Sequence, residues 1–116
     1  MKFGKYIRQK RETLSKESNE HSLRKVAAKI KVEPAFLSKV ERDMVSPPSE
    51  AKIMILADVL NEDRDVLLAL GGKVSSDLLK VIQARPKLFA DLLRKLKTEP
   101  DHAILSIVRE VSDGEW

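Results

Sequence analysis

Apolar residues recur along this chain at intervals of three and four, the spacing that places them on one face of an α-helix. Ser22 and Ser49 can each cap a helix, and Pro34 suits a first helical position. Gly71-Gly72 is a strong signal for a helix end. The sequence therefore predicts an all-α protein, with helices at about 2–14, 22–30, 34–42, 50–60, 64–70, 75–84, from 86 and from 100.

The same signals predict two domains. Residues 1–72 contain five helices, enough for one complete domain, and residues 73–116 follow as a C-terminal bundle of two to three helices. The polar segment 15–21 is expected to be an exposed loop or an extra turn of the first helix. Residues 44–48 form a connector, because consecutive prolines end any helix before them.

Residues 22–42 have the pattern of two short amphipathic helices joined by a tight turn. Their apolar residues are expected to bury one stripe of each helix in a common core, and a small residue suits the point where the two helices cross. These residues are Val26, Ala27 and Ile30 on the first helix and Phe36, Leu37 and Val40 on the second. This arrangement is typical of a DNA-reading helix-turn-helix, whose second helix enters the major groove.

Helical spacing places a set of candidate DNA-binding residues opposite that apolar stripe. The set consists of Glu33, Pro34, Ala35, Ser38, Lys39 and Arg42. Glu33 has two interpretations: a partner for a cytosine amino group, or an acid that favours the start of the helix dipole. The stretch is poor in hydrogen-bond donors, which favours apolar contacts of Pro34 and Ala35 with thymine methyl groups.

The stretch resembles the Xre/Cro-type family of phage repressors, which includes the lambda repressor. The resemblance rests on Val26-Ala27, Ile30-Lys31-Val32 and the run from Phe36 to Arg42, and it extends over roughly residues 3–70. It implies a five-helix, lambda-repressor-like domain in a dimeric repressor that binds an inverted-repeat operator in double-stranded DNA. Lys31 stands where this family usually has a glycine with a left-handed backbone.

The resemblance also assigns roles to single residues. It places Pro34, Ala35 and Lys39 among the base readers, and it places Ser22, Ser38 and Arg42 at phosphate contacts. Arg11 and Glu41 match a pair that supports the recognition helix. The alternative for that pair is two independent surface charges with almost no effect on stability.

Charge and composition narrow the function class. Residues 1–42 carry twelve Lys and Arg against five Glu, whereas residues 43–116 carry ten against thirteen Asp and Glu, so the basic charge coincides with the motif. The chain has no cysteine, no export signal and no long apolar run, which predicts a cytoplasmic protein without a membrane span. His21 and His102 stand apart, and His21 is expected to be a polar loop residue. We therefore expect no enzyme activity, no metal site and no cofactor.

Several interpretations remain for the apolar C-terminal helices. They could form a homodimer interface, pack back on their own domain, or bind a partner protein, as in an antitoxin that neutralises a toxin and represses its own operon. Each fits an apolar tail that follows a complete domain. A further alternative is a non-specific architectural protein, which predicts steep salt dependence of DNA binding without sequence preference.

Overall fold

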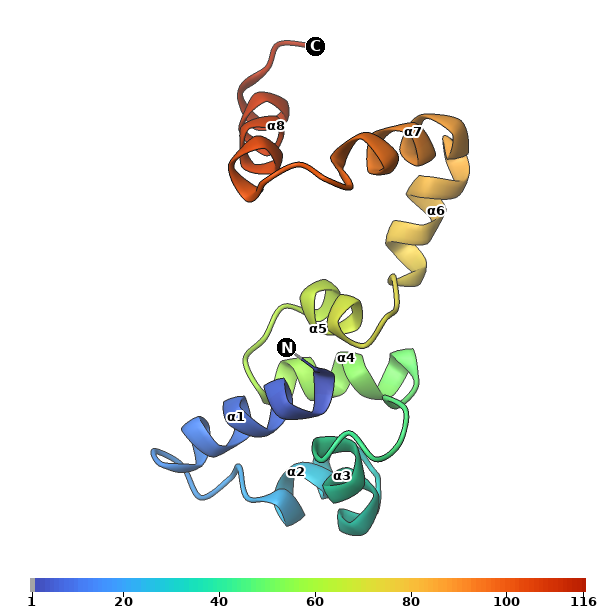
Figure 1. Cartoon of the computed structure of the whole chain (residues 1–116). Coiled ribbons are helices and arrows are strands. Elements are labelled where there is room, and N and C mark those ends of the chain that lie inside the picture. Colours follow the sequence, from blue (N-terminus) through green and yellow to red (C-terminus); the bar gives the residue numbers. More distant parts are fainter. Residues whose placement is uncertain (1) are drawn as a thin grey trace. The chain divides into compact units, whose positions relative to one another are not determined.

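The computed structural model describes residues 2–116, and every regular element in that range is an α-helix (Figure 1). The helices are α1 (Phe3–Ser15), α2 (Leu23–Lys29), α3 (Pro34–Glu41), α4 (Glu50–Val59), α5 (Arg64–Leu70), α6 (Ser76–Ala84), α7 (Pro86–Leu96) and α8 (Asp101–Asp113). The prediction of an all-α protein is confirmed. Each predicted helix start and end lies within one residue of the observed position.

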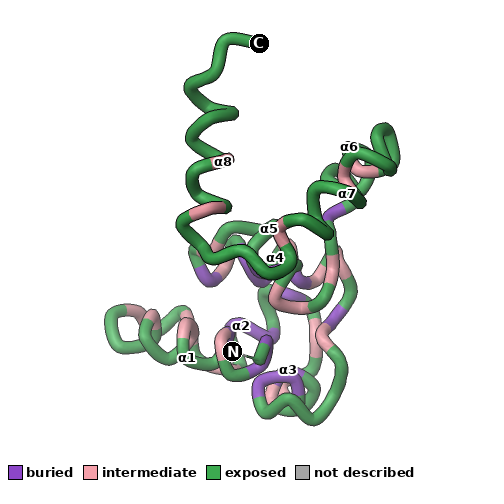
Figure 2. The backbone as a smooth tube through the Cα atoms, turned by 45° about the horizontal axis from the view of Figure 1, so that its top comes forward, coloured by how far each residue is buried: buried purple, intermediate pink, exposed green. Residues whose placement is uncertain are grey.

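The chain divides into two units, Met1–Ser76 and Asp77–Trp116. The first unit holds α1 to α5, in which α3 packs against α1 and α2, and α4 packs against α2 and α5. Its core is built from the inward faces of all five helices, as Figure 2 shows for the buried positions. The core residues are Phe3, Ile7, Val26, Ala27, Ile30, Leu37, Val40, Ile53, Leu56, Ala57, Leu60, Leu67 and Leu68.

The inward stripe of α3 differs from the expected one. Phe36 is 36% exposed, so its assignment to the buried stripe was wrong, whereas Glu41 is buried at 6% exposure. Leu37 and Val40 are buried as expected. The buried face of α3 therefore includes Glu41 at its C-terminal end and excludes Phe36. The Glu41 carboxylate can be buried because it has a cationic partner inside the unit.

Four consecutive helices end in the same left-handed turn. At the end of α2, the Lys31 N–H donates to the Ala28 carbonyl at 3.2 Å and the Val32 N–H donates to the Ala27 carbonyl at 3.0 Å. The pattern repeats after α3, α4 and α5, at residues with positive φ. These residues are Lys31, Asp43, Asn61 and Gly72, with φ of 60°, 56°, 55° and 75°. Lys31 thus has the backbone conformation expected for a position usually held by glycine.

Lys31→Gly is expected to raise the free energy of unfolding by up to about 1 kcal/mol, since glycine adopts positive φ without steric cost. The gain is moderated because Lys52 Nζ donates to the Lys31 carbonyl at 3.1 Å and already steadies the turn. Urea unfolding of both proteins measures the change. The matched control is Ala28→Gly within α2, which should lose about 1 kcal/mol instead. A loss of stability in Lys31→Gly would contradict the prediction.

The second unit has helices but no core of its own. Within residues 76–113, all of which the structure describes, no side chain of α6, α7 or α8 is buried. The predicted C-terminal bundle is therefore corrected to three helices without a buried core, whose apolar side chains are exposed or half-buried. Among the described residues, no helix combines the length and the apolar character that a membrane crossing requires.

A side-chain hydrogen bond joins α1 to the turn after α4. The Tyr6 hydroxyl donates to the Glu62 carboxylate. This bond, helped by the Asp63 N–H, holds the pKa of Glu62 below its usual value. A carboxylate with a lowered pKa in the folded state stabilises the fold above its ordinary pKa, and that stability is lost as the pH falls through the folded pKa.

Tyr6→Phe is therefore expected to lower the free energy of unfolding by about 1 kcal/mol at neutral pH, the usual worth of such a bond. The difference from the unsubstituted protein should shrink as the pH falls through the lowered folded-state pKa of Glu62, because protonation removes the carboxylate that the hydroxyl stabilises. Thermal unfolding at several pH values measures it. A difference that does not change with pH throughout the acid range in which the protein stays folded would show that the effect comes from packing alone.

Candidate nucleic-acid interface

The helix α1 packs against α3 and helps to hold it in position. Leu37 and Val40 anchor α3 in the core, and the first turn of α1 lies directly against its end. A Cβ at Gly4 would lie 2.1 Å from the Val40 carbonyl oxygen and 2.6 Å from Asp43 Oδ1. Only glycine permits so close an approach, so Gly4 sets the distance between the two helices.

Asp43 joins the same two helices by hydrogen bonds. Its carboxylate accepts from the Gly4 N–H at 2.8 Å and from the Lys5 N–H at 3.2 Å, although it lies in the turn that ends α3. The residue that precedes α1, Lys2, provides no side-chain cap. Asp43 therefore satisfies first-turn N–H groups of α1 that would otherwise lack partners, and its charge suits that end of the helix.

A buried ion pair links α1 to α3 on the other side. Arg11 Nε and Nη2 donate to the two carboxylate oxygens of Glu41 at 2.7 and 2.9 Å, and Nη1 donates to the His21 carbonyl at 3.3 Å. The two side chains are only 12% and 5% exposed. The hydrogen bonds that Arg11 donates to Glu41 raise the pKa of Arg11 above its ordinary value. The two residues are thus a buried pair and not independent surface charges.

His21 has a structural role that the expectation of a polar loop residue missed. Its side chain is half-buried, and Nε2 lies 3.0 Å from the Val59 carbonyl at the end of α4. Because a carbonyl only accepts hydrogen bonds, Nε2 must carry the proton. His21 therefore fastens segment 16–22, which is a series of turns and not an extra helical turn, to the unit.

The structure brings the predicted DNA-binding residues together on α3 and at the start of α2. Five are exposed: Ser22, Glu33, Ala35, Lys39 and Arg42. The other two, Pro34 and Ser38, are half-buried. The Ser22 hydroxyl accepts from the Lys25 N–H at 3.2 Å and so caps α2, and Arg42 Nε donates to the Ser38 carbonyl at 3.2 Å. Glu33 precedes α3 without a side-chain capping bond.

A small hollow lies where α1, α2 and α3 meet. Its volume is about 150 Å³. Two predicted phosphate contacts, Ser38 and Arg42, line it together with Arg8, Arg11, Leu23 and Glu41. Arg8 was not among the predicted residues, and it already pairs with Glu12 at 2.7 Å on the exposed side of α1. The hollow offers guanidinium and hydroxyl donors to an anion of phosphate size.

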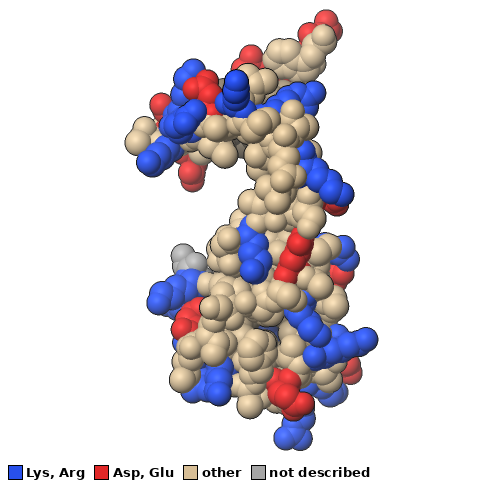
Figure 3. All heavy atoms as spheres, turned by 90° about the vertical axis from the view of Figure 1, so that its right-hand side faces the viewer, with Lys and Arg blue, Asp and Glu red and all other residues tan. Residues whose placement is uncertain are grey.

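On the face that Figure 3 shows, positive charge is mixed with negative charge, with Asp and Glu among the Lys and Arg. Two lysines of α2 already form ion pairs, because Lys25 and Lys29 lie 3.5 and 3.4 Å from the Glu20 carboxylate. Lys39 has no ion pair of this kind among the described residues.

Residues 2–116 contain no group of three or more His, Asp or Glu placed to hold a metal ion. Comparison of the chain with protein-family models, with curated proteins and with solved structures finds no match. The candidate interface therefore rests on the residues and contacts described above.

Proposed function

We propose that this protein is a sequence-specific, double-stranded-DNA-binding transcriptional regulator of the Xre/Cro type, built on a lambda-repressor-like domain. The observation that carries the proposal is the exposure of Ala35 and Lys39 on α3 and of Arg42 directly after it, on a short helix fixed firmly in its unit. A helix held in this way can enter the major groove without losing its orientation. The regulator acts as a cytoplasmic homodimer and represses transcription.

In this proposal, different residues of the motif contact the bases and the phosphates. Pro34 and Ala35, at the start of α3, read thymine methyl groups, and Lys39 one turn later reaches a guanine or a phosphate. Ser22 and Arg42 contact the DNA backbone. The hollow lined by Ser38 and Arg42 receives one phosphate and sets the register of the helix on the duplex.

Selection from a random pool of duplex DNA at near-physiological salt tests the proposal. An enriched inverted repeat, with half-sites about one helical turn apart and thymine under the start of α3, is expected. DNA retained without enrichment would support an architectural protein instead. If no DNA is retained, the result would contradict the proposed function.

Lys39→Ala is expected to weaken binding to the selected site about tenfold and to relax the preference at one base pair, because it removes a contact in the groove. Arg42→Ala should weaken binding to all sequences alike and reduce the salt dependence by about one released ion. Titrations at several salt concentrations measure both effects. Lys80→Ala on α6 removes the same charge away from α3 and should change neither. Equal effects of all three substitutions would contradict the proposed interface.

A further inference from the structure

The helices α7 and α8 each carry a stripe of apolar side chains that are exposed or only half-buried in the single chain. The stripe of α7 contains Leu88, Phe89, Leu92, Leu93 and Leu96, and that of α8 contains Ile104, Leu105, Ile107, Val108 and Val111. Leu88 is 68% exposed, Leu93 57% and Val111 62%. Isolated apolar residues at a surface are common, but two continuous stripes on adjacent helices indicate an interface.

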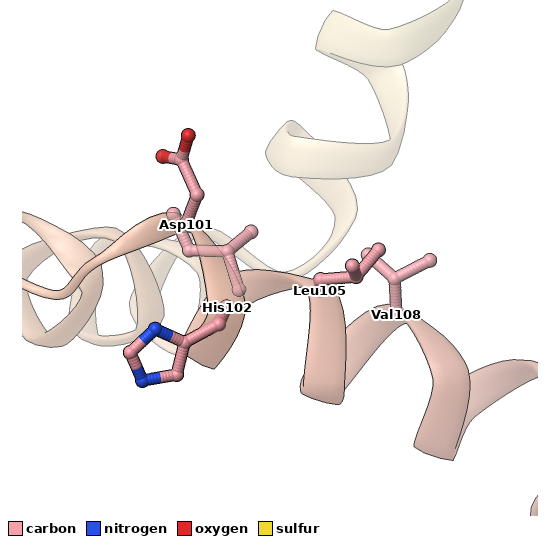
Figure 4. A pocket seen from close by; sticks show the side chains of 5 residues that line it. Asp101, His102, Leu105 and Val108 are labelled. Atoms are coloured by element: carbon pink, nitrogen blue, oxygen red, sulfur yellow. The ribbon is translucent and has the colours of Figure 1, made fainter.

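A hollow lies along the apolar stripe of α8. It is shallow, has a volume of about 490 Å³ and runs along Ile104, Leu105 and Val108. Figure 4 shows Leu105 and Val108 side by side on one edge of the helix, while the imidazole of His102 points away from them. A smaller hollow of about 150 Å³ lies beside Leu88, Phe89 and Leu92 on α7. Both helices thus present apolar surface with recesses.

The two helices carry opposite charge. Residues 85–97, which include α7, hold five Lys and Arg and one Asp, whereas residues 99–115, which include α8, hold five Asp and Glu and one Arg. Helical spacing places Lys95 beside the apolar stripe of α7 and Glu110 beside that of α8. Lys95 pairs only weakly with its neighbour Asp91, at 3.1 Å and with 75% of its side chain exposed. The charges that flank the two stripes are therefore complementary.

We infer that a second copy of this chain covers these faces, with α7 of one copy packed against α8 of the partner and α8 against the partner's α7. A twofold dimer makes this contact twice and buries all four stripes. Pairing α7 with α7, or α8 with α8, would bring like charges together and is disfavoured. This inference rests on the homodimer of the proposed function and names the surface that forms it. A monomeric chain that still selects a DNA sequence would overturn the inference and leave sequence-specific DNA binding intact, so the two failures are distinguishable.

Sedimentation equilibrium of the full chain without DNA is the first test. The protein is expected to be a dimer, and Leu92→Asp or Val108→Asp should each weaken the dimer by roughly a hundredfold, since each places a carboxylate in the apolar contact. Lys87→Ala, on the polar face of α7, is the matched control and should leave the dimer unchanged. Far-UV circular dichroism checks that the helices persist. A monomeric parent protein would overturn the inference and favour a foreign protein partner.

Charge reversal then identifies which helices meet. Lys95→Glu/Lys97→Glu makes the end of α7 acidic, and Asp101→Lys/Glu110→Lys makes α8 basic. Each variant alone should dimerise about tenfold more weakly at low salt, whereas an equal mixture of the two should form a heterodimer close to the parent in strength. Failure of the mixture to recover, with recovery in the chain that carries all four substitutions, would mean that α7 and α8 pair within one chain and would overturn the inference.

Discussion

Replacement of Arg11 with methionine is expected to lower the free energy of unfolding by about 3 to 5 kcal/mol. The Glu41 carboxylate, 5% exposed, would be left inside the unit without the two guanidinium hydrogen bonds that now satisfy it. Methionine preserves most of the packing of the arginine stem, so the loss reports mainly on the uncompensated charge. Urea unfolding followed by circular dichroism measures it.

Two further variants separate the charge effect from other causes. Arg8→Met removes a similar guanidinium from the Arg8–Glu12 pair, whose side chains are 54% and 52% exposed, and should cost less than about 1 kcal/mol. Arg11→Met/Glu41→Leu removes both buried charges and should recover most of the stability lost by Arg11→Met alone. If Arg8→Met and Arg11→Met were equally destabilising, the view of Arg11–Glu41 as a buried structural pair would be wrong.

Gly4→Ala is expected to destabilise the first unit by about 3 kcal/mol, near the upper end of overpacking costs. The added Cβ meets the backbone oxygen of Val40 at 2.1 Å, and backbone cannot turn aside as a flexible side chain can. Either α1 moves away from α3 or the end of α3 unwinds, and in both cases the Asp43 bonds to the first turn of α1 lengthen. Thermal unfolding gives the loss, and amide exchange of Gly4 and Lys5 locates it.

Gly72→Ala is the matched control for this substitution. A Cβ at Gly72 meets nothing within 4 Å, and only its φ of 75° opposes alanine, at a cost of about 1 kcal/mol. The prediction therefore requires Gly4→Ala to be clearly the more destabilising of the two. Similar losses for both would mean that backbone conformation, and not the close approach of α1 to α3, decides the role of Gly4.

Local signals account for what the sequence predicts well. Ser22 and Ser49 each accept a first-turn N–H, from Lys25 and Lys52, and the helices begin where these caps indicate. The ends of the helices follow from short-range patterns too, such as Gly71-Gly72 after α5, whereas the left-handed backbone of Lys31 was expected from the family resemblance alone. Such signals act over three to six residues, so a single sequence contains them in full.

The features that prediction missed depend on contacts between distant residues. Asp43 was assigned no role, because a carboxylate 39 residues away from the N–H that it caps has no signature in the sequence. Phe36 was placed wrongly for a related reason, because hydrophobicity alone favours its burial. The pairing of Arg11 with Glu41 was predicted from the family resemblance and is confirmed, whereas the spacing of apolar residues alone gives no sign of it. The hydrogen bond of His21 to Val59 is a long-range contact of the same kind.

The hydrogen bonds of Asp43 to Gly4 and Lys5 also decide when α1 can be capped during synthesis of the chain. A ribosome completes α1 long before it adds Asp43, so α1 emerges with first-turn N–H groups bonded only to water and with its end frayed. The cap forms only after α3 has been made and has ended in its left-handed turn. The first unit thus cannot acquire its final form before residue 43 has been made, and a nascent chain that stops short of it is expected to keep the start of α1 open to proteases.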